Sequence, residues 1–339
     1  MRTARKGHRD PGQRADIPPL LLGLLIAVVS ATTSPAESPE VLESLGPQTI
    51  PALIKLLRDP DHFVRIEAAH TLQKIGAPAV PALTMLVRDP NSSNIRYRAL
   101  MILGRMELEA KPAISAMIEA LRDPEWDVRR MAVAALERMG LEAGDAVPAL
   151  VLVLHDPEPN ICTAAGRVLR KMGPIAVPAL TEMVRDADGN ARYRAIVTLG
   201  QIGPDARTAI PAIASTVRDG EWCVRKAAVD ALEEMGAEAK IAIPALVVLL
   251  RDPERNIRTV AARVLSKLGP PAVPVLTDLV RDNDAAVRYH AIVALGRMGT
   301  DAQNTVPAIT SALQDSDWVV RQTAADALKQ IKKSVLQAW

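Results

Sequence analysis

Apolar residues recur along this chain with the spacing of one face of an α-helix. The pattern is clearest in residues 62–75, where apolar side chains lie four, four and three residues apart at Val64, Ala68, Leu72 and Ile75. Side chains at this spacing share one helix face, and Thr71 falls on the polar side of that helix. A shorter apolar stretch comes just before it, with Leu53, Leu56 and Leu57. The pattern predicts two consecutive helices.

The same pair of apolar stretches recurs on average every 32 residues. A proline, preceded mostly by Val or Ile, opens the first stretch of each copy: Pro51, Pro81, Pro112, Pro148, Pro178, Pro211, Pro244, Pro274 and Pro307. An aspartate closes it: Asp59, Asp89, Asp123, Asp156, Asp186, Asp219, Asp252, Asp282 and Asp315. Proline is well tolerated in the first turn of a helix. We therefore expect nine helical hairpins in one register.

Each second helix has its own start and stop signals. The turns Asp59-Pro60-Asp61, Asp123-Pro124-Glu125 and Asp252-Pro253-Glu254 each offer an aspartate as N-cap, a proline at the first helical position and an acid that complements the helix dipole. A glycine at the far end is expected to close the second helix in seven copies: Gly76, Gly140, Gly173, Gly203, Gly236, Gly269 and Gly299.

A basic residue follows the aspartate by six or seven positions in eight of the nine copies: Arg65, Arg96, Arg129, Arg192, Arg225, Arg258, Arg288 and Arg321. A charge at the edge of an apolar face needs a partner. We expect an aspartate of the same or the neighbouring repeat to supply it, which would form a ladder of ion pairs along the stack. The fourth copy has Cys162 at this position, which predicts a locally weaker joint.

The motif Asp-Pro-Asp-x-x-Val-Arg-x-x-Ala-Ala-x-x-Leu-x-x-Ile-Gly of residues 59–76 resembles HEAT-like repeats, and its short, alanine-rich form is most similar to the variety named after phycobilisome lyases. The resemblance covers residues 47–333. It implies an all-α fold, an α-solenoid of about nine helical hairpins wound into a right-handed superhelix, with the second helices on the concave side. In such folds a hairpin is stabilised by stacking on its neighbours.

A longer period lies above the first. Tyr97, Tyr193 and Tyr289 are 96 residues apart, and so are Trp126, Trp222 and Trp318. The chain therefore consists of three copies of a three-repeat unit, which we call a trio. We expect residues 37–46 to cap the first trio and residues 334–339 to form a C-terminal tail.

The N-terminal 36 residues differ from the rest. Five basic residues precede an apolar run from Leu20 to Val29 and small residues that permit cleavage after Ala31 or Ala36. The run is too short to span a bilayer but suits a signal peptide, so we expect a secreted or periplasmic protein with no membrane span once the leader is removed. The remainder holds 36 basic and 37 acidic residues, so bulk attraction to nucleic acid is not expected.

The sequence contains few of the residues that catalytic and metal sites need. The five histidines form no His-x-x-x-His pair, and none is followed by Glu. Cys162 and Cys223 are two repeats apart, too far for a disulfide, and are expected to be free thiols. We expect no catalytic residues, no metal and no cofactor.

Aromatic residues are only 2% of the chain, yet most of them occupy repeated positions. On a helix with about 100° per residue, the Trp position points about 120° away from the core face and the Tyr position about 160° away. Both are therefore assigned to an exposed flank, with Arg98, Arg194 and His290 as a cationic rim beside the tyrosines. The candidate ligand-binding residues are Tyr97, Arg98, Trp126, Tyr193, Arg194, Trp222, Tyr289, His290 and Trp318.

Two interpretations of the aromatic residues stay open. Each Trp could fold over the turn between repeats and only pack on its neighbour, or each Tyr could lie beside the Trp of the next repeat and form one of three similar binding patches. The leading hypothesis for function is a non-enzymatic scaffold that binds a protein or peptide along the concave surface. The alternatives are a carbohydrate or cell-wall binder and a helper subunit of a lyase-type enzyme.

Overall fold

The computed structural model describes the backbone of residues 39–337 and the side chains from residue 48 onward. The predicted leader, residues 1–36, lies outside this range. Within the described residues every regular element is helical, as the sequence predicts, and none is a strand. By their contacts, the described residues form two compact units, residues 39–120 and residues 121–337.

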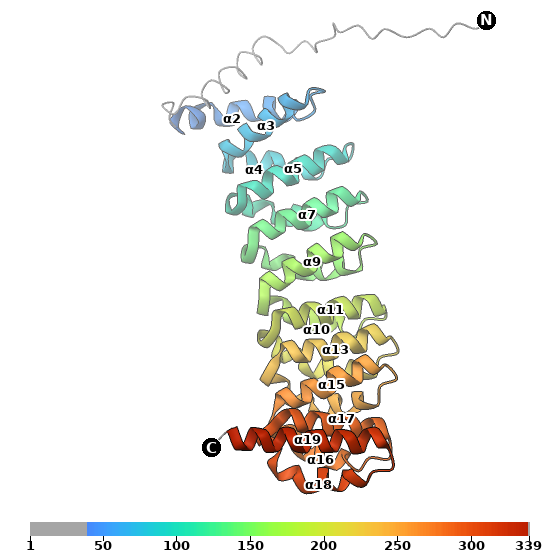
Figure 1. Ribbon diagram of the computed structural model, residues 1–339. Helices are drawn as coiled ribbons and strands as arrows, with labels where there is room; N and C mark the ends of the chain where they lie inside the picture. The colour runs from blue at the N-terminus through green and yellow to red at the C-terminus, as the bar shows by residue number, and fades with distance from the viewer. Residues whose placement is uncertain (1–38, 338–339) are drawn as a thin grey trace, which may run out of the picture. The chain divides into compact units, whose positions relative to one another are not determined.

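Helices alternate between two sets along the chain (Figure 1). The first helices of the nine repeats are α2 (Pro39–Leu56), α4 (Val80–Val87), α6 (Ile114–Ala120), α8 (Val147–Leu152), α10 (Val177–Met183), α12 (Ile210–Ser215), α14 (Ile243–Val248), α16 (Val273–Leu279) and α18 (Val306–Ser311). The second helices are α3 (His62–Ile75), α5 (Ser93–Met106), α7 (Trp126–Met139), α9 (Pro159–Met172), α11 (Gly189–Ile202), α13 (Trp222–Glu234), α15 (Arg255–Leu268), α17 (Ala285–Met298) and α19 (Trp318–Gln337).

Seven of the nine second helices in the described residues end within two residues of the predicted glycine. All seven predicted glycines have a positive φ, between 59° and 75°, which turns the chain sharply into a 3₁₀ segment. In the second repeat Glu107 takes this place with φ 50°. That segment, Glu107–Ala113, also contains Pro112, and α6 begins only at Ile114. Pro112 thus does not open a first helix, and neither does Pro51, which lies inside α2. The other seven prolines each lie in the first turn of their helix, as predicted.

The second helices begin later than predicted. Asp59 is not the N-cap of α3, because its carboxylate accepts the backbone N–H of Asp61 and closes a turn before the helix. Asp61 is the N-cap, and its side chain accepts the N–H of Phe63. The same two-step start recurs at Asp186 and Asp188. The prediction placed the helix start two residues too early, because a turn aspartate and a capping aspartate give similar signals.

The core consists of small and medium aliphatic side chains between the two sets of helices. Leu72, Leu169 and Leu265 are fully buried at the same position of the first repeat of each trio. Thr71 is also buried, at 4% exposure, although the apolar pattern placed it on the polar side. Its hydroxyl donates to the Glu67 carbonyl within its own helix, which removes the cost of burying it.

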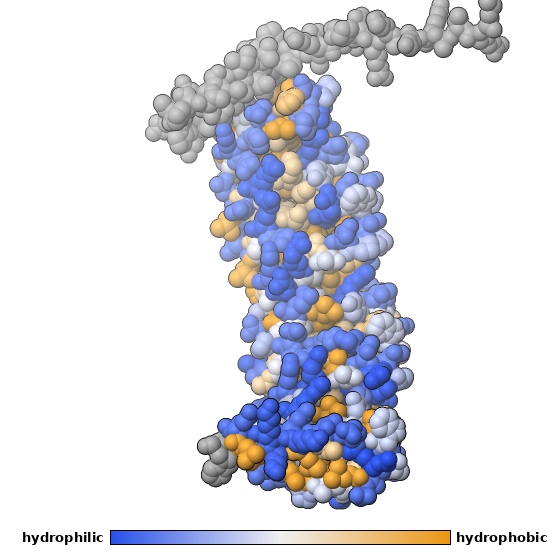
Figure 2. All heavy atoms as spheres, in the orientation of Figure 1, coloured by the Kyte–Doolittle hydropathy of each residue, from blue (hydrophilic) through white to orange (hydrophobic). Residues whose placement is uncertain are grey.

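The residue 121–337 unit is a stack of second helices that lie side by side (Figure 1). Two of its joints are especially close, because a β-carbon at Gly200 would come within 2.9 Å of Ala231 and one at Gly296 within 2.9 Å of Ala327. Glycine therefore allows α11 to approach α13, and α17 to approach α19, at the same joint of successive trios. Figure 2 shows hydrophobic side chains gathered at the α18–α19 end of this unit.

Candidate functional site

The predicted ladder of ion pairs forms at four of the contacts between consecutive repeats, which we call joints. The joints that lack such a pair differ from one another, and the one after the fourth repeat is the most unusual. Arg129, Arg192, Arg225 and Arg288 each pair with the aspartate of the next repeat through two hydrogen bonds of 2.6–3.2 Å. Each arginine also donates to backbone carbonyls of its own turn. The hydrogen bond from Arg288 is the largest influence on the Asp315 carboxyl group and lowers its pKa. These pairs tie consecutive repeats together.

The first joint of each trio is built differently. Here the aspartates of consecutive repeats are 30 residues apart instead of 33 or 34. Arg65 and Arg258 donate to carbonyls of their own turns and not to the next aspartate, and the fourth repeat has Cys162 at this position. The residue just before the turn takes over this role. Arg251 pairs with Asp282 in the third trio, and Arg58 pairs with Asp89 in the first. In the second trio the equivalent residue is His155, whose ring nitrogens lie 3.2 Å from Asp186 and 3.6 Å from Asp188.

The fourth repeat departs from its own pattern at two further positions. Cys162 stands where the seventh repeat has Arg258, and Gly166 stands where it has Ala262. The Cys162 thiol is buried and lies 3.0 Å from the Asp156 carbonyl, to which it donates. Burial raises its pKa, so the sulfur stays protonated and unreactive at neutral pH. A thiol and a hydrogen atom thus replace a guanidinium group and a methyl group.

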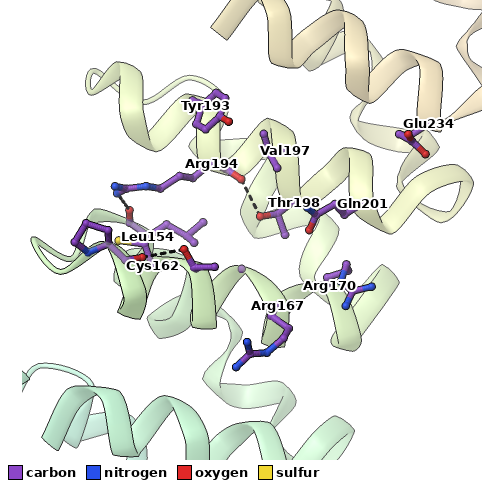
Figure 3. Close-up of a pocket in the computed structure, with 13 residues that line it drawn as sticks. Leu154, Cys162, Arg167, Arg170, Tyr193, Arg194, Val197, Thr198, Gln201 and Glu234 are labelled. Atoms are coloured by element: carbon purple, nitrogen blue, oxygen red, sulfur yellow. Dashed lines mark hydrogen bonds between the residues drawn. The ribbon is translucent and has the colours of Figure 1, made fainter. Parts of the chain in front are cut away.

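A cavity of about 860 Å³ lies where these side chains are missing, between α9 and α11 (Figure 3). We call it the polar cavity. Its walls include the buried side chains of Leu154, Cys162 and Thr198. The Thr198 hydroxyl donates to the Arg194 carbonyl within α11, so the thiol and the hydroxyl already have partners.

A second cavity of about 420 Å³ continues the first across α11 to α13. We call it the aromatic cavity, because Tyr193 and Trp222 both line it, together with Val197 and Ala231. Tyr193, Val197, Gln201 and Glu234 line both cavities. The two cavities therefore form one continuous groove over three consecutive second helices, which we call the central groove.

Charge in the polar cavity is mainly positive. Arg167, Arg170 and Arg194 line it, and Glu234 is its single acidic side chain. Arg167 is already paired with Glu137, which also binds Lys171 at 2.7 Å. Arg194 donates one N–H to the Leu154 carbonyl. Figure 3 shows Arg194 reaching toward Leu154 at one end of the cavity, with Arg167 and Arg170 at the other.

Three predicted site residues meet in this groove. Tyr193 is 40% exposed and Trp222 is 59% exposed, and they line the same cavity, as predicted for a Tyr and the Trp of the next repeat. Arg194 lies beside them in the polar cavity. Trp126 and Trp318 also have exposed rings, 48% and 69%, and the guanidinium of Arg130 lies 5.6 Å from the Trp126 ring centre. In the residue 39–120 unit, Tyr97 and Arg98 line a separate cavity of about 570 Å³ with His62 and His70.

The third Tyr position does not match the prediction. His290 was expected on an exposed cationic rim, but it is only 5% exposed. Burial, together with the positive charges of Arg258, Arg255 and Arg297, lowers its pKa to about 4, so the ring is neutral at pH 7. Tyr289 is half-buried against it, with ring centres 4.9 Å apart. The larger angle from the core did not make the tyrosines more exposed than the tryptophans, because neighbouring second helices flank the Tyr position.

The sequence interpretation missed Arg170 and Gly166. For Cys162 the sequence predicted only a missing ion pair and not a cavity. Comparing the fourth repeat with the seventh would have pointed to all three positions, since Arg258, Ala262 and Ser266 replace Cys162, Gly166 and Arg170 there. Within the described part of the chain, no group of three or more His, Cys, Asp or Glu residues could hold a metal ion. None of the helices in residues 39–337 is both long and apolar enough to cross a membrane.

Comparison with known proteins identifies the family of this chain. The sequence profile of the family described as HEAT repeats matches residues 36–104, 92–170, 114–190, 177–247 and 273–338. The chain belongs to the HEAT-repeat family. The resemblance seen in the sequence is thereby confirmed over most of its length. No curated protein matches the chain.

Solved structures share the HEAT-repeat fold at low sequence identity. A mutant of the karyopherin Kap121p is 12% identical, with a TM-score of 0.57 over 95% of this chain and 42% of its own. Kap121p bound to the extreme C-terminus of the protein phosphatase Cdc14p is 13% identical, with a TM-score of 0.56 over 91% and 42%. Kap121p bound to Pho4p is also 13% identical, with a TM-score of 0.56 over 91% and 41%. The chain thus spans about two fifths of these karyopherins, and the likeness establishes the fold.

Proposed function

We propose that this HEAT-repeat protein is a non-enzymatic scaffold that binds a protein or peptide segment in the central groove. The observation that carries this proposal is the pair of joined cavities bordered by Tyr193 and Trp222. Large aromatic side chains with exposed faces, set in a concavity with a few polar groups, are typical of the residues that dominate binding energy at interfaces. Their rings add contact area at a small cost in conformational entropy.

Two further observations support binding over catalysis. The reactive side chains of the groove are already committed: the Cys162 thiol donates to a carbonyl, and so does the Thr198 hydroxyl. Kap121p, which shares the fold, has been solved with the C-terminus of Cdc14p and with Pho4p bound. A stack of helical hairpins presents a long row of second helices, and solenoids of this kind use such extended surfaces for binding.

The test is a selection from a library of displayed random peptides on the purified full chain. We expect enrichment of related peptides, and we expect Trp222→Ala or Tyr193→Ala to abolish their binding. Trp318→Ala is the matched control, because Trp318 is equally an exposed tryptophan of a third repeat but lies outside the groove. Melting temperatures of all three variants separate lost binding from lost folding.

The alternatives have their own outcomes in the same experiment. Binding of oligosaccharides on a glycan array, with the same dependence on Trp222, would favour a carbohydrate binder. Failure of both libraries, combined with enzymatic turnover only in the presence of a second subunit, would favour a helper of an enzyme.

We also propose that the protein is exported, on the basis of the basic and apolar succession in residues 1–36. The N-terminus of the mature protein is then Thr32 or Glu37, which mass spectrometry can determine. An intact Met1 in the mature protein would contradict cleavage.

A further inference from the structure

The polar cavity is a specific feature of the fourth repeat. In the seventh repeat, which occupies the same place in its trio, Arg258 donates to the carbonyls of Asp252 and Pro253. Ala262 follows one turn later and is buried at 1% exposure. In the fourth repeat, Cys162 and Gly166 replace these two side chains with shorter ones. A β-carbon at Gly166 would lie 3.3 Å from the Thr198 hydroxyl and 3.9 Å from Leu154, two residues of the cavity wall. The missing atoms thus open space directly over α9.

The cations around this space are only partly neutralised. Arg170 is exposed and makes no ion pair within residues 48–337, and Arg194 uses one N–H on a neutral carbonyl. Glu137 lies outside the cavity lining and already pairs with both Arg167 and Lys171. An arginine fork can hold a carboxylate through two parallel hydrogen bonds. The polar cavity therefore presents two arginines with free donors and one opposing acid, Glu234.

We propose that the central groove recognises an acidic peptide segment of a partner protein, in which carboxylates enter the polar cavity and an adjoining apolar or aromatic side chain enters the aromatic cavity. This inference rests on the proposed scaffold function and specifies its ligand. Arg170 and Arg194 lie at opposite ends of the polar cavity (Figure 3), so a segment with more than one acid fits better than a single carboxylate. Tyr193, between the two cavities, sets the spacing between acid and apolar anchor.

A peptide is favoured over a single-stranded nucleic acid, although arginines and aromatic rings also suit the latter. Nucleic-acid binding needs an extended run of positive charge. The groove lacks one, because the aromatic cavity pairs Lys226 with Asp230 and includes Glu234. Beyond residue 36 the chain carries one more acidic than basic residue.

The test measures fluorescence anisotropy with three labelled probes on the full chain. The first is a short peptide with glutamates on both sides of a Leu-Phe pair, the second is the same peptide with every Glu replaced by Gln, and the third is a single-stranded DNA oligonucleotide. We expect the acidic peptide to bind at least about tenfold more tightly than its Gln version, since hydrogen bonds to charged groups contribute about that factor. Its affinity should fall as salt is added.

Two variants separate charge from shape. Arg170→Gln should weaken the acidic peptide by about tenfold and leave the Gln peptide unchanged. Arg185→Gln, an exposed arginine outside the groove, is the matched control and should change neither. Cys162→Met combined with Gly166→Ala fills the polar cavity without altering charge. It should reduce binding of the acidic peptide to a level near that of the Gln peptide, with an unchanged melting temperature.

Each contrary result has a distinct meaning. Equal affinity for both peptides, still lost in Trp222→Ala, would overturn acid recognition and leave the scaffold function standing. No binding of any peptide, in the assay or in the library selection, would remove both. Tighter binding of the DNA probe with the same dependence on Arg170 would reassign the groove to nucleic acid and overturn the proposal.

Discussion

The fourth and seventh repeats occupy the same place in successive trios, and they differ most where each meets the repeat that follows. Both have a fully buried leucine in the second helix, Leu169 and Leu265. In both, the turn aspartate of the next repeat follows after only 30 residues. The seventh repeat fills the edge of that joint with Arg251, Arg258 and Ala262, whereas the fourth has His155, Cys162 and Gly166.

This difference shows how a repeat protein can gain a specific site. The apolar core of a HEAT hairpin determines the stacking, and it is alike in both repeats. Arg251 adds an ion pair and Arg258 adds hydrogen bonds to backbone carbonyls, but the apolar core also joins each repeat to the next. One repeat can therefore lose both arginines and remain in the stack. The lost side chains leave a cavity on the row of second helices, where a ligand can reach it.

The largest expected effect tests whether the two repeats share one core. Leu169→Ala and Leu265→Ala should each lower the free energy of unfolding by about 2–5 kcal/mol, because both create a cavity in a fully packed interior. Thr163→Ala and Thr259→Ala, equivalent exposed positions of the same helices, should stay within about 0.5 kcal/mol. Chemical denaturation measures all four. A large difference between the two leucine variants would break the equivalence.

Acid should separate the two joints. His290 packs at the joint after the seventh repeat, whereas Arg194 holds this place after the fourth. The pKa of His290 is about 4 in the folded protein against 6.5 for an ordinary histidine, so the unfolded chain takes up a proton that the folded chain does not. Stability should therefore fall by up to about 3 kcal/mol as the pH drops from about 6.5 to about 4. His290→Gln should flatten this part of the pH profile of unfolding, and an unchanged slope would contradict the assignment.

A smaller effect is expected from giving the seventh repeat the residue of the fourth. Arg258→Cys removes two hydrogen bonds to the carbonyls of Asp252 and Pro253, and it also removes a buried Nε–H that has no partner. These effects oppose each other, so we expect a net loss of about 1 kcal/mol in stability. Thermal unfolding can measure it. A loss of several kcal/mol would show that the joint depends on its arginine, and that the fourth repeat is compensated elsewhere.

The smallest expected effect concerns the exposed tryptophans. Trp222→Ala and Trp318→Ala should each change the free energy of unfolding by no more than about 0.5 kcal/mol, because most of each ring faces solvent. A marked loss for Trp222 alone would assign that ring to packing between α11 and α13, and the proposed peptide site would then lose its main anchor.

Much of the fold could be predicted from the sequence, because each repeat contains its own signals. The helical period, the closing glycines and the ladder arginines all have local causes, and nine copies reinforce one another. Errors arose where two structures share one signal. Asp59 resembles a helix cap but closes a turn, and Pro112 resembles a helix start but lies in a 3₁₀ segment.

The site was harder to predict, for a different reason. The sequence drew attention to what was added to the repeats, the aromatic residues, and Tyr193, Arg194 and Trp222 do meet in one groove. The polar cavity, however, arises from what the fourth repeat lacks. The burial of His290 depends on side chains from α15 as well as from its own helix, and such contacts cannot be seen in the period of a single helix.

The close contact of Gly200 with Ala231, repeated at Gly296 and Ala327, has a consequence for how this chain can change in length. Excision of the sixth repeat alone would bring Gly200 opposite the position of Val264, whose larger side chain has no room at that distance. Excision of a whole trio would instead place Glu137 beside Arg263 and Lys267, which now pair with Glu233 at the equivalent position. Recombination within the gene should therefore add or remove repeats three at a time.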